Sequence, residues 1–472
     1  MIHPSKSLLF TLGLTLATGL ASAEEKAPAL TLHDLIVGAV NANLELSARR
    51  LDPEIQNNRL DGAWAAFEPT WIAGYSYSSS ERAQNYVNNA LGQRFSPVFE
   101  EDISRWQTGI AGRLPFGTQY ELLTGFDRTD NTSIRNPGNG FSTVTARFVP
   151  EYVSTTTLTL TQPLMREFGP AANLAEVRLQ RSTLKTAKHD LEATALRVIR
   201  DVAAAYYEMV FAQENIRVKQ EAVAVAEALV RDNQRRLDEG RMAPIDVTQA
   251  RSRLSEAREE LLLAENFLAQ RRNTLRELTR DEFPLDEVPF VVDPSFIVRE
   301  APAIDREKSL VTLFEQNPTY LAGLELTKSE DIRIAYAKNQ RWPRVDLKAS
   351  FGYNGLAADI GDAYSDYQER TQPTYSVGVV VNVPIGNRAA KARLREAENR
   401  KRQAILNLKR TEVVLGTGRT TSYEVAQAQR DLSQIRSREL ATLVDLNKSV
   451  AQLQFVLGTL AEHLRVDLKT AE

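Results

Sequence analysis

The helical pattern from Leu174 to Leu278, broken by a turn at Gly240, constrains the fold of this chain more than any other feature. Apolar residues recur at intervals of seven from Val177 onward and again from Val247, with Glu, Lys, Arg and Gln between them. This is the pattern of a coiled-coil seam. No Pro or Gly interrupts Leu174 to Glu239, and a helix of that length would extend about 100 Å. We therefore expect two long antiparallel helices, joined by a tight turn at Gly240, in a protein that reaches across a gap.

The charge balance and the lack of cysteine exclude several kinds of protein. The formal net charge is −3, with 25% charged residues, which argues against nucleic acid as a partner because nucleic-acid-binding proteins carry a basic excess. The chain has no Cys, so a disulfide, a thiolate zinc site and a lipid-anchoring cysteine are all excluded.

Residues 1–23 have the features of a cleaved secretory signal peptide. Lys6 precedes a short apolar run from Leu8 to Leu20, and Ala21-Ser22-Ala23 is a small-x-small cleavage site. The alternative is a short membrane anchor. Further along, no run of about 20 apolar residues occurs, so we expect that any membrane crossing is made by strands.

Four segments alternate between apolar and polar residues and are predicted to be strands. They lie near residues 70–80, 155–164, 344–354 and 375–385. Their polar sides carry Asp, Lys and Asn, and aromatic residues lie near their ends, which favours strands with lipid on one side and water on the other. A half-buried sheet on a soluble core is the alternative. For the segment 105–128 the sequence leaves two alternatives: it adds further strands to the barrel, or it forms an external hairpin.

The order of these elements occurs twice in the chain. In each half, an Asn at a break in the helical pattern is followed 26 residues later by a Pro that precedes a predicted strand. These pairs are Asn43 with Pro69 and Asn317 with Pro343. Equal spacing indicates an internal duplication. We assign residues 30–279 to a first repeat, 280–303 to a Pro-rich connector and 304–466 to a second repeat.

Four strands cannot close a barrel, because single-chain barrels begin at eight strands and lipid does not tolerate an open edge. Several copies of the chain must therefore share one barrel. The predicted fold class is a mixed one: a membrane β-barrel shared between protomers, continued by a long α-helical coiled-coil barrel.

The duplicated pattern resembles the TolC family of outer-membrane efflux ducts. The segment Leu160 to Leu164 with Phe168-Gly169 is similar to the strand-to-helix junction of that family, and residues 236–247 and 415–425 are similar to its two helix-hairpin tips. The resemblance implies a homotrimer with a shared 12-stranded barrel, embedded in the outer membrane of a Gram-negative bacterium and extending into the periplasm. It also implies a periplasmic adaptor protein and an inner-membrane transporter as partners in efflux or type I secretion.

The second repeat departs from this family pattern. Arg178 to Gly240 spans 62 residues, whereas the equivalent pair, Arg393 to Gly418, spans 25. The descending helix of the second repeat is thus about 37 residues short, or roughly 55 Å. The returning helix, from Ser422 to Leu464, is expected at full length.

The two tips, at 240–246 and 418–424, hold the candidate functional residues. These are Gly240, Arg241, Asp246, Gly418, Arg419 and Glu424. The resemblance implies that Asp246 lines the narrow end of a tunnel, where a ring of carboxylates would favour cations and pair with Arg241 or Arg419. The alternative is a carboxylate that offsets the dipole of a helix start, and Thr421 with Glu424 has the spacing of a capping box.

No catalytic pattern is present. The four His residues are scattered, without metal-ligand spacing, and no phosphate-binding glycine loop occurs. We expect no enzymatic activity, no cofactor and no metal. Two alternatives to a duct stay open: a periplasmic coiled-coil adaptor, and an outer-membrane scaffold that does not conduct because its second repeat is shortened.

Overall fold

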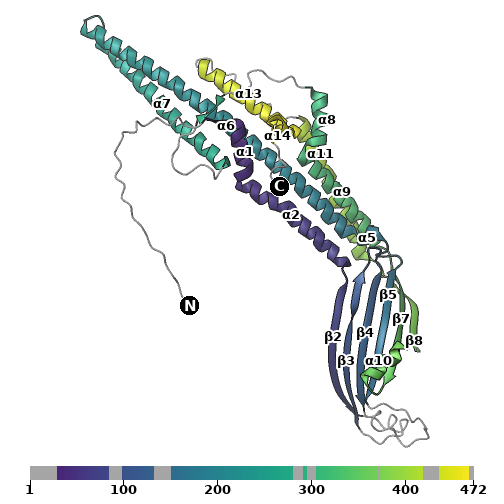
Figure 1. Cartoon of the computed structure of the whole chain (residues 1–472). Helices are drawn as coiled ribbons and strands as arrows, with labels where there is room; N and C mark the ends of the chain where they lie inside the picture. The colour runs from purple at the N-terminus through teal and green to yellow at the C-terminus, as the bar shows by residue number, and fades with distance from the viewer. Residues whose placement is uncertain are drawn as a thin grey trace, which may run out of the picture. The chain divides into compact units, whose positions relative to one another are not determined.

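The computed structural model describes residues 29–83, 98–131, 150–279, 291–294, 305–369, 372–417 and 435–466 (Figure 1). The chain divides into two compact units. Unit 1 comprises residues 1–42, 201–300 and 434–448, and unit 2 comprises residues 43–200, 301–433 and 449–472. The predicted signal peptide, most of the Pro-rich connector and the tip at 418–424 lie outside the described residues.

Unit 2 contains one antiparallel sheet of six strands. In spatial order they are β2 (Thr70–Ala83), β3 (Val98–Arg113), β4 (Gln119–Asn131), β5 (Glu151–Pro163), β7 (Arg344–Ala357) and β8 (Pro373–Asn382). The sheet therefore has two strands more than the four segments predicted from the sequence. The segment left open at 105–128 belongs to the sheet, because its alternation of apolar and polar residues supplies two more strands, β3 and β4.

Strand ends also differ from the sequence prediction. The strand expected at 375–385 ends at Asn382, close to Pro384, which has no N–H to donate to a ladder. Strands β2 and β3 are longer than expected and pair up to Ala83 and Val98, because polar residues are tolerated in a strand that is exposed on one face.

A tight turn joins β3 to β4 at the helical end of the sheet. Leu114 N donates to Thr118 O at 2.8 Å, and Gly117 N donates to Leu114 O at 2.8 Å. Gly117 has a φ of +96°, in the left-handed region that glycine adopts without steric cost. The Pro115-Phe116-Gly117 sequence thus reverses the chain and leaves both strands in the same sheet.

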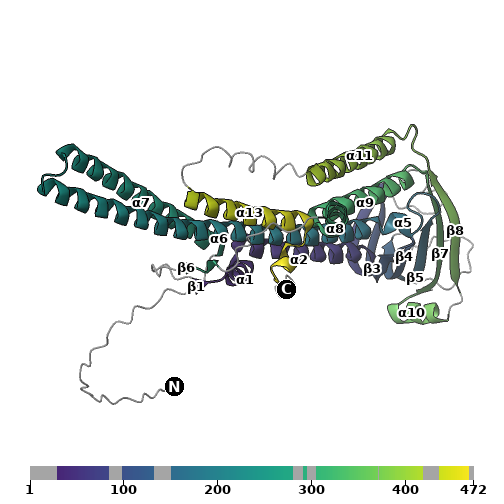
Figure 2. The same cartoon turned by 90° about the horizontal axis from the view of Figure 1, so that it is seen from above.

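Helices that include the first part of α6 extend from that end of the sheet (Figures 1 and 2). Helix α2 leads into β2 through the short helix η1 (Ala65–Phe67), helices α5 and α6 follow β5, helix α9 leads into β7, and helix α11 follows β8. Their bounds are α2 Leu44–Trp64, α5 Pro170–Asn173, α6 Ala175–Asp238, α9 Pro318–Asn339 and α11 Arg388–Thr417.

Polar contacts join these helices as a row. An ion pair between Glu45 and Arg197 links α2 to α6. Ser182 Oγ donates to Glu325 O at 3.1 Å, linking α6 to α9. Helices α9 and α11 pack through Ala337, Leu394 and Ala397. The helices therefore follow the order of the strands from which they continue.

Asparagine caps mark equivalent positions in the two repeats. Asn43 Oδ1 accepts from Leu46 N at 3.0 Å at the start of α2, and Asn317 Oδ1 accepts from Tyr320 N at 2.9 Å at the start of α9. Asn317 also ends α8 (Arg306–Gln316). An N-cap carboxamide satisfies a backbone donor that the helix leaves unpaired, which explains why both helical breaks fall at Asn.

Unit 1 is built around the far part of α6. It includes α1 (Leu32–Ala42), α7 (Pro244–Thr279) and a two-residue parallel pairing of β1 (Ala29–Leu30) with β6 (Val291–Val292). Tyr206 is fully buried, and its hydroxyl donates to Asp293 O. Burial, followed by the nearby Asp293 charge, raises the pKa of Tyr206, so the hydroxyl stays protonated as a donor.

A carboxylate in unit 1 ties three helices together. Glu208 of α6 accepts from Lys448 Nζ of α13 (Ile435–Leu457) at 2.7 Å and from Arg271 Nη1 of α7 at 2.5 Å. Burial opposes the charged form of Glu208, but the hydrogen bonds and charges of Lys448 and Arg271 outweigh it and hold the pKa of this carboxyl below its usual value.

The helices of the two repeats differ in length. Helix α6 has 64 residues and α7 has 36, whereas α11 has 30. The returning helix expected to reach Leu464 ends at Leu457 instead. Gly458 has a φ of +82° and stops it, while Thr459 N donates back to Gln454 O at 3.0 Å. The short helix α14 (Leu460–His463) follows.

Within the described part of the chain, none of the helices is long and apolar enough to cross a membrane.

We predict that Gly117→Ala destabilises unit 2 more than Gly169→Ala. Both glycines have positive φ, but a Cβ on Gly117 would lie 2.5 Å from Glu167 O, whereas nothing lies within 4 Å of a Cβ on Gly169. Backbone strain costs about 1–3 kcal/mol in both variants, and the clash adds to it only in Gly117→Ala. Urea unfolding in detergent micelles measures the difference, and equal losses would contradict it.

We predict that Glu208→Gln lowers the free energy of unfolding at pH 7 by about 1–3 kcal/mol, because charged hydrogen bonds are lost. Since the folded pKa of Glu208 is depressed, its stabilisation is present above the unfolded pKa and disappears as pH falls through the folded pKa. The variant should therefore lose less stability on acidification than the parent.

The control for this experiment is Glu227→Gln. Glu227 also pairs with two arginines, Arg258 at 2.9 Å and Arg231 at 3.8 Å, but on an exposed surface, where ion pairs contribute little. Urea unfolding at pH 7 and pH 4 compares the variants. An identical pH dependence of the parent and Glu208→Gln would show that the carboxylate is not a stabilising group.

Candidate functional site

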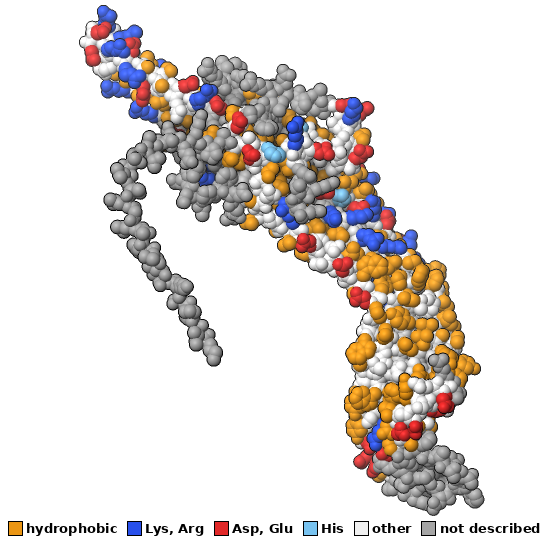
Figure 3. All heavy atoms as spheres, viewed as in Figure 1, with side chains coloured by type: hydrophobic (Ala, Val, Ile, Leu, Met, Phe, Trp, Pro, Cys, Tyr) orange, Lys and Arg blue, Asp and Glu red, His pale blue; other side chains and the backbone are white. Residues whose placement is uncertain are grey.

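The six-stranded sheet has one apolar face. Because directly paired residues of neighbouring strands point to the same side, the register places one set of large side chains together (Figure 3). We call this set the apolar face: Trp71, Tyr75, Trp106, Ile110, Leu122, Leu158, Phe351, Tyr375, Val377, Val379 and Val381. Trp71 is 73% exposed and Tyr375 is 77% exposed. In water such a surface would be unfavourable, so it indicates contact with an apolar medium.

The opposite face of the same sheet is polar. It carries Arg82, Glu101, Arg105, Gln107, Asp127, Thr157, Thr159, Lys348, Ser350 and Ser376. Arg105 and Asp127 pair at 2.9 Å, Arg82 and Glu101 pair at 2.9 Å, and the hydroxyls of Ser350 and Ser376 lie 2.7 Å apart. Charged groups in this density require water on their side.

The height of the apolar face matches a membrane. On β7 it extends from Val345 to Tyr353, which is about 26 Å at the usual rise of a strand, close to the apolar band of about 25 Å in membrane barrels. Nearer the end of the sheet away from the helices, charges return on the same side, where Tyr77 donates to Asp102 at 3.1 Å.

A short helix covers the apolar face at that end of the sheet (Figure 1). Helix α10 (Ile360–Gln368) packs on β5 and β7. Ser154 Oγ donates to Ala363 O at 2.6 Å, and the rings of Tyr364 and Phe126 lie 6.3 Å apart. Gly355 permits this approach, since a Cβ there would lie 2.4 Å from Ala363 O. The exposed apolar band is therefore bounded by protein at this end.

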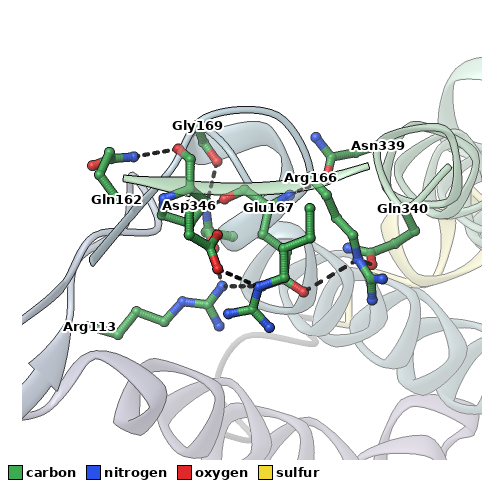
Figure 4. A network of polar contacts seen from close by, with 11 residues as sticks. Arg113, Gln162, Arg166, Glu167, Gly169, Asn339, Gln340 and Asp346 are labelled. Atoms are coloured by element: carbon green, nitrogen blue, oxygen red, sulfur yellow. Dashed lines mark hydrogen bonds and ion pairs between the residues drawn. The ribbon is translucent and has the colours of Figure 1, made fainter. Parts of the chain in front are cut away.

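At the opposite end, a network of polar contacts joins strands to helices (Figure 4). Glu167 N donates to Asn339 Oδ1 at 2.8 Å, and Arg166 Nε donates to Gln340 Oε1 at 2.7 Å. These bonds connect the segment after β5 to the end of α9. Leu164 N donates to Val345 O at 2.7 Å. The first-repeat and second-repeat junctions are thus held directly to each other.

The turn between β3 and β4 belongs to the same network. Gly169 N donates to Phe116 O at 3.1 Å. Arg113 Nη2 donates to Asn173 Oδ1 at 2.5 Å and lies 3.5 Å from Glu167 Oε2. Asn173 Nδ2 in turn donates to Glu167 O at 2.8 Å. This arrangement fixes the hairpin against the start of the long helix.

The first tip, at 240–246, lies entirely within the described residues. Gly240 has a φ of +72°, and Arg241 N donates to Arg236 O at 2.8 Å, which closes the end of α6. Asp246 lies in the first turn of α7. Within the described residues, the ion pair of Arg241 is with Glu239, at 3.4 Å, and not with Asp246. The pairing of an Asp246 ring with Arg241 or Arg419 stays a prediction.

The second tip, at 418–424, is outside the part of the chain that the structure describes. Gly418, Arg419 and Glu424 lie outside the described residues, so their roles stay predictions. Among the residues that the structure describes, there is no group of three or more His, Asp or Glu that would hold a metal ion.

Sequence reasoning missed the junction network and Glu208. Part of the junction was predictable, since Gly117 and Gly169 indicate turns at the points where strands meet helices. The partners of Glu167 and Arg166 lie more than 170 residues away along the chain. A local sequence pattern does not predict such contacts.

Comparison with known proteins relates part of the chain to a family. A family model described as outer membrane efflux protein matches residues 135–279. The chain is 25% identical over 279 residues to the probable efflux pump outer membrane protein TtgC of Pseudomonas putida, covering 57% of this chain and 54% of TtgC. It is 26% identical over 317 residues to the outer membrane protein TolC of Vibrio cholerae, covering 58% of this chain and 71% of TolC.

The fold extends over the whole chain. The crystal structure of the CmeC outer membrane channel of Campylobacter jejuni matches with a TM-score of 0.52 and 15% identity, covering 98% of this chain and 99% of CmeC. In sequence, the chain spans about half the length of TtgC. Residues 135–279 thus match the outer membrane efflux protein family, and the chain shares the fold of a solved outer membrane channel.

Proposed function

We propose that the protein is a passive duct in the outer membrane of a Gram-negative bacterium. The observation that carries this proposal is the two-faced sheet, which is apolar on one side and polar on the other. The chain leaves this sheet into α6, a helix of 64 residues. Such a chain places a water-lined passage in lipid and extends it by about 96 Å into an aqueous space.

Closure of the passage requires several copies. Strands β2 and β8 are the two edges of the sheet, and the unpaired backbone of an edge strand is not tolerated in lipid. The two edge strands run in opposite directions, so β8 of one copy and β2 of the next are able to pair as an antiparallel ladder. A homotrimer with a shared barrel, as the family resemblance implies, satisfies both edges of every copy.

Partners would supply the energy and the specificity. TtgC, as its name states, is an outer membrane protein of an efflux pump. By analogy, this duct would meet a periplasmic adaptor protein at its helical tips and receive cargo from an inner-membrane transporter, in efflux or in type I secretion. It would work without catalysis and without a cofactor.

A second function, an outer-membrane scaffold that does not conduct, is favoured by one observation. Within the described residues, α11 has 30 residues and α6 has 64, so the helical arms that the structure describes differ in length between the two repeats. The scaffold would insert in the membrane as the duct does but would carry no ions.

The orientation of the sheet is testable with two adjacent cysteines, since the chain has none of its own. Leu347 and Lys348 are neighbours on β7 and pair with Val379 and Gly378 of β8, which places them on the apolar and the polar face. In membranes, we expect a water-soluble maleimide to label Lys348→Cys and not Leu347→Cys, because one thiol would face water and the other lipid.

Labelling in detergent with sodium dodecyl sulfate is the control, in which both thiols should react. Equal labelling of the two variants in intact membranes would mean that both faces meet water. That result would contradict a membrane-spanning sheet and favour a periplasmic adaptor.

The tip residue Asp246 is testable by ion selectivity. If Asp246 from several copies lines the narrow end, Asp246→Asn should lower the permeability of potassium relative to chloride, because a ring of carboxylates favours cations. Reversal potentials in a salt gradient measure this ratio, with an expected decrease of about twofold or more. Asp232→Asn is the control, since Asp232 is already paired with Arg236 at 2.9 Å. An unchanged ratio in Asp246→Asn would leave Asp246 as a helix-start residue only.

A further inference from the structure

From the extra hairpin in the sheet, we infer that three copies of this chain build an outer-membrane barrel of eighteen strands, not twelve. The inference rests on the proposed function and deepens it, because it sets the width of the passage. Each copy contributes a sheet of six strands, and three copies supply three times six.

Strands β3 and β4 are paired along most of their length on both sides. The β2–β3 ladder extends from Thr70 opposite Ala111 to Ala83 opposite Val98. The β4–β5 ladder extends from Gln119 opposite Thr161 to Thr129 opposite Glu151. A hairpin that lay outside the barrel would leave β2 to pair directly with β5, and here it separates them.

The hairpin also carries the same two faces as the rest of the sheet. Trp106, Ile110 and Leu122 belong to the apolar face and are 60%, 46% and 42% exposed. Arg105 and Asp127 pair on the polar face. Side chains of an external hairpin would have no reason to alternate in phase with strands that cross a membrane.

The junction holds the hairpin where the barrel meets the helices. The bond from Gly169 N to Phe116 O and the bond from Arg113 to Asn173, at 3.1 Å and 2.5 Å, fix its turn beside the start of α6. Gly117 lies so close to Glu167 O that a Cβ would clash. The hairpin is therefore anchored between the strands that continue into α2 and α6.

The width of six strands also matches the width of the helical layer. If neighbouring strands lie about 4.8 Å apart and are tilted by about 40°, six strands occupy about 38 Å of the barrel circumference. The row of α2, α6, α9 and α11, at interaxial distances of about 8–10 Å, has an arc of about 36 Å. Four strands would give only about 25 Å. The six-stranded sheet thus continues the helical wall without narrowing.

The consequence is a wider exit. Barrel diameter grows about linearly with the number of strands, so eighteen strands give about 1.5 times the radius and about twice the cross-section of twelve. The sheet would then not limit the size of the cargo, and size selection would fall to the helical tips.

Cysteine pairs test the position of the hairpin in the native protein. The hydroxyls of Thr124 and Thr156 lie 3.0 Å apart across β4 and β5, so the pair Thr124→Cys and Thr156→Cys should form a disulfide within one chain. The pair Ala73→Cys and Thr156→Cys should not, because β3 and β4 separate these positions by about 14 Å. A disulfide in the second pair, in membranes, would place the hairpin outside the barrel and overturn the inference.

Polymer exclusion tests the width. Deletion of residues 98–149 would leave β2 and β5 adjacent in one copy and give twelve strands. With neutral polyethylene glycols added on the side of the sheet, the largest polymer that lowers the single-channel conductance should have a radius about 1.5 times larger for the full chain than for the deletion variant. Equal cut-offs would overturn the inference.

These outcomes separate the inference from the proposed function. A full chain that conducts, with a disulfide between positions 73 and 156, keeps the duct and removes the wide barrel. A full chain that forms no channel removes the duct, although the disulfide between positions 124 and 156 still confirms the six-stranded sheet. If the deletion variant does not fold, the two disulfides decide the position of the hairpin alone.

Discussion

In the proposed duct, the structure depends on one constraint, which is that the backbone hydrogen bonds of a sheet in lipid must all be made. Five antiparallel ladders satisfy the inner strands of this sheet, and only the edges β2 and β8 are left for other copies. The apolar face permits contact with lipid, while the ion pair of Arg105 with Asp127 holds charges on the side of water. In the proposed duct, such a sheet would be unfavourable as an isolated piece, and its two edges would pair with other copies of the chain.

The helices depend on the same sheet through the junction. Arg166 and Glu167 bond to the end of α9, and Asn173 bonds back to Glu167 O at 2.8 Å. These contacts are short and directional, so they hold the segment after β5 against the end of α9. In unit 1 the charge of Glu208, shared by Arg271 and Lys448, links three helices in a comparable way. The protein thus combines apolar packing along the helices with polar contacts at the points where the chain changes direction.

Much of this organisation was predictable because it is local or periodic. The long helix follows from the absence of Pro and Gly between Leu174 and Glu239, and the breaks at Asn43 and Asn317 follow from N-cap chemistry. Strands β3 and β4 were harder to predict because their ends are polar, and an exposed polar strand resembles a loop in sequence. The junction network was not predictable, since its partners are distant in the chain. The early end of the returning helix at Gly458 was missed because a single glycine does not always stop a helix.

The most direct test of the central claim is the single-channel conductance of the purified full-length protein in planar lipid bilayers. We expect discrete, long-lived conductance steps, because several copies would enclose a continuous water-lined passage. A second preparation, with about 37 helical residues inserted after Lys409, would show whether the short arm of the second repeat limits the current. Protein that inserts in the bilayer as an oligomer but carries no current, with or without the restored arm, would contradict the duct.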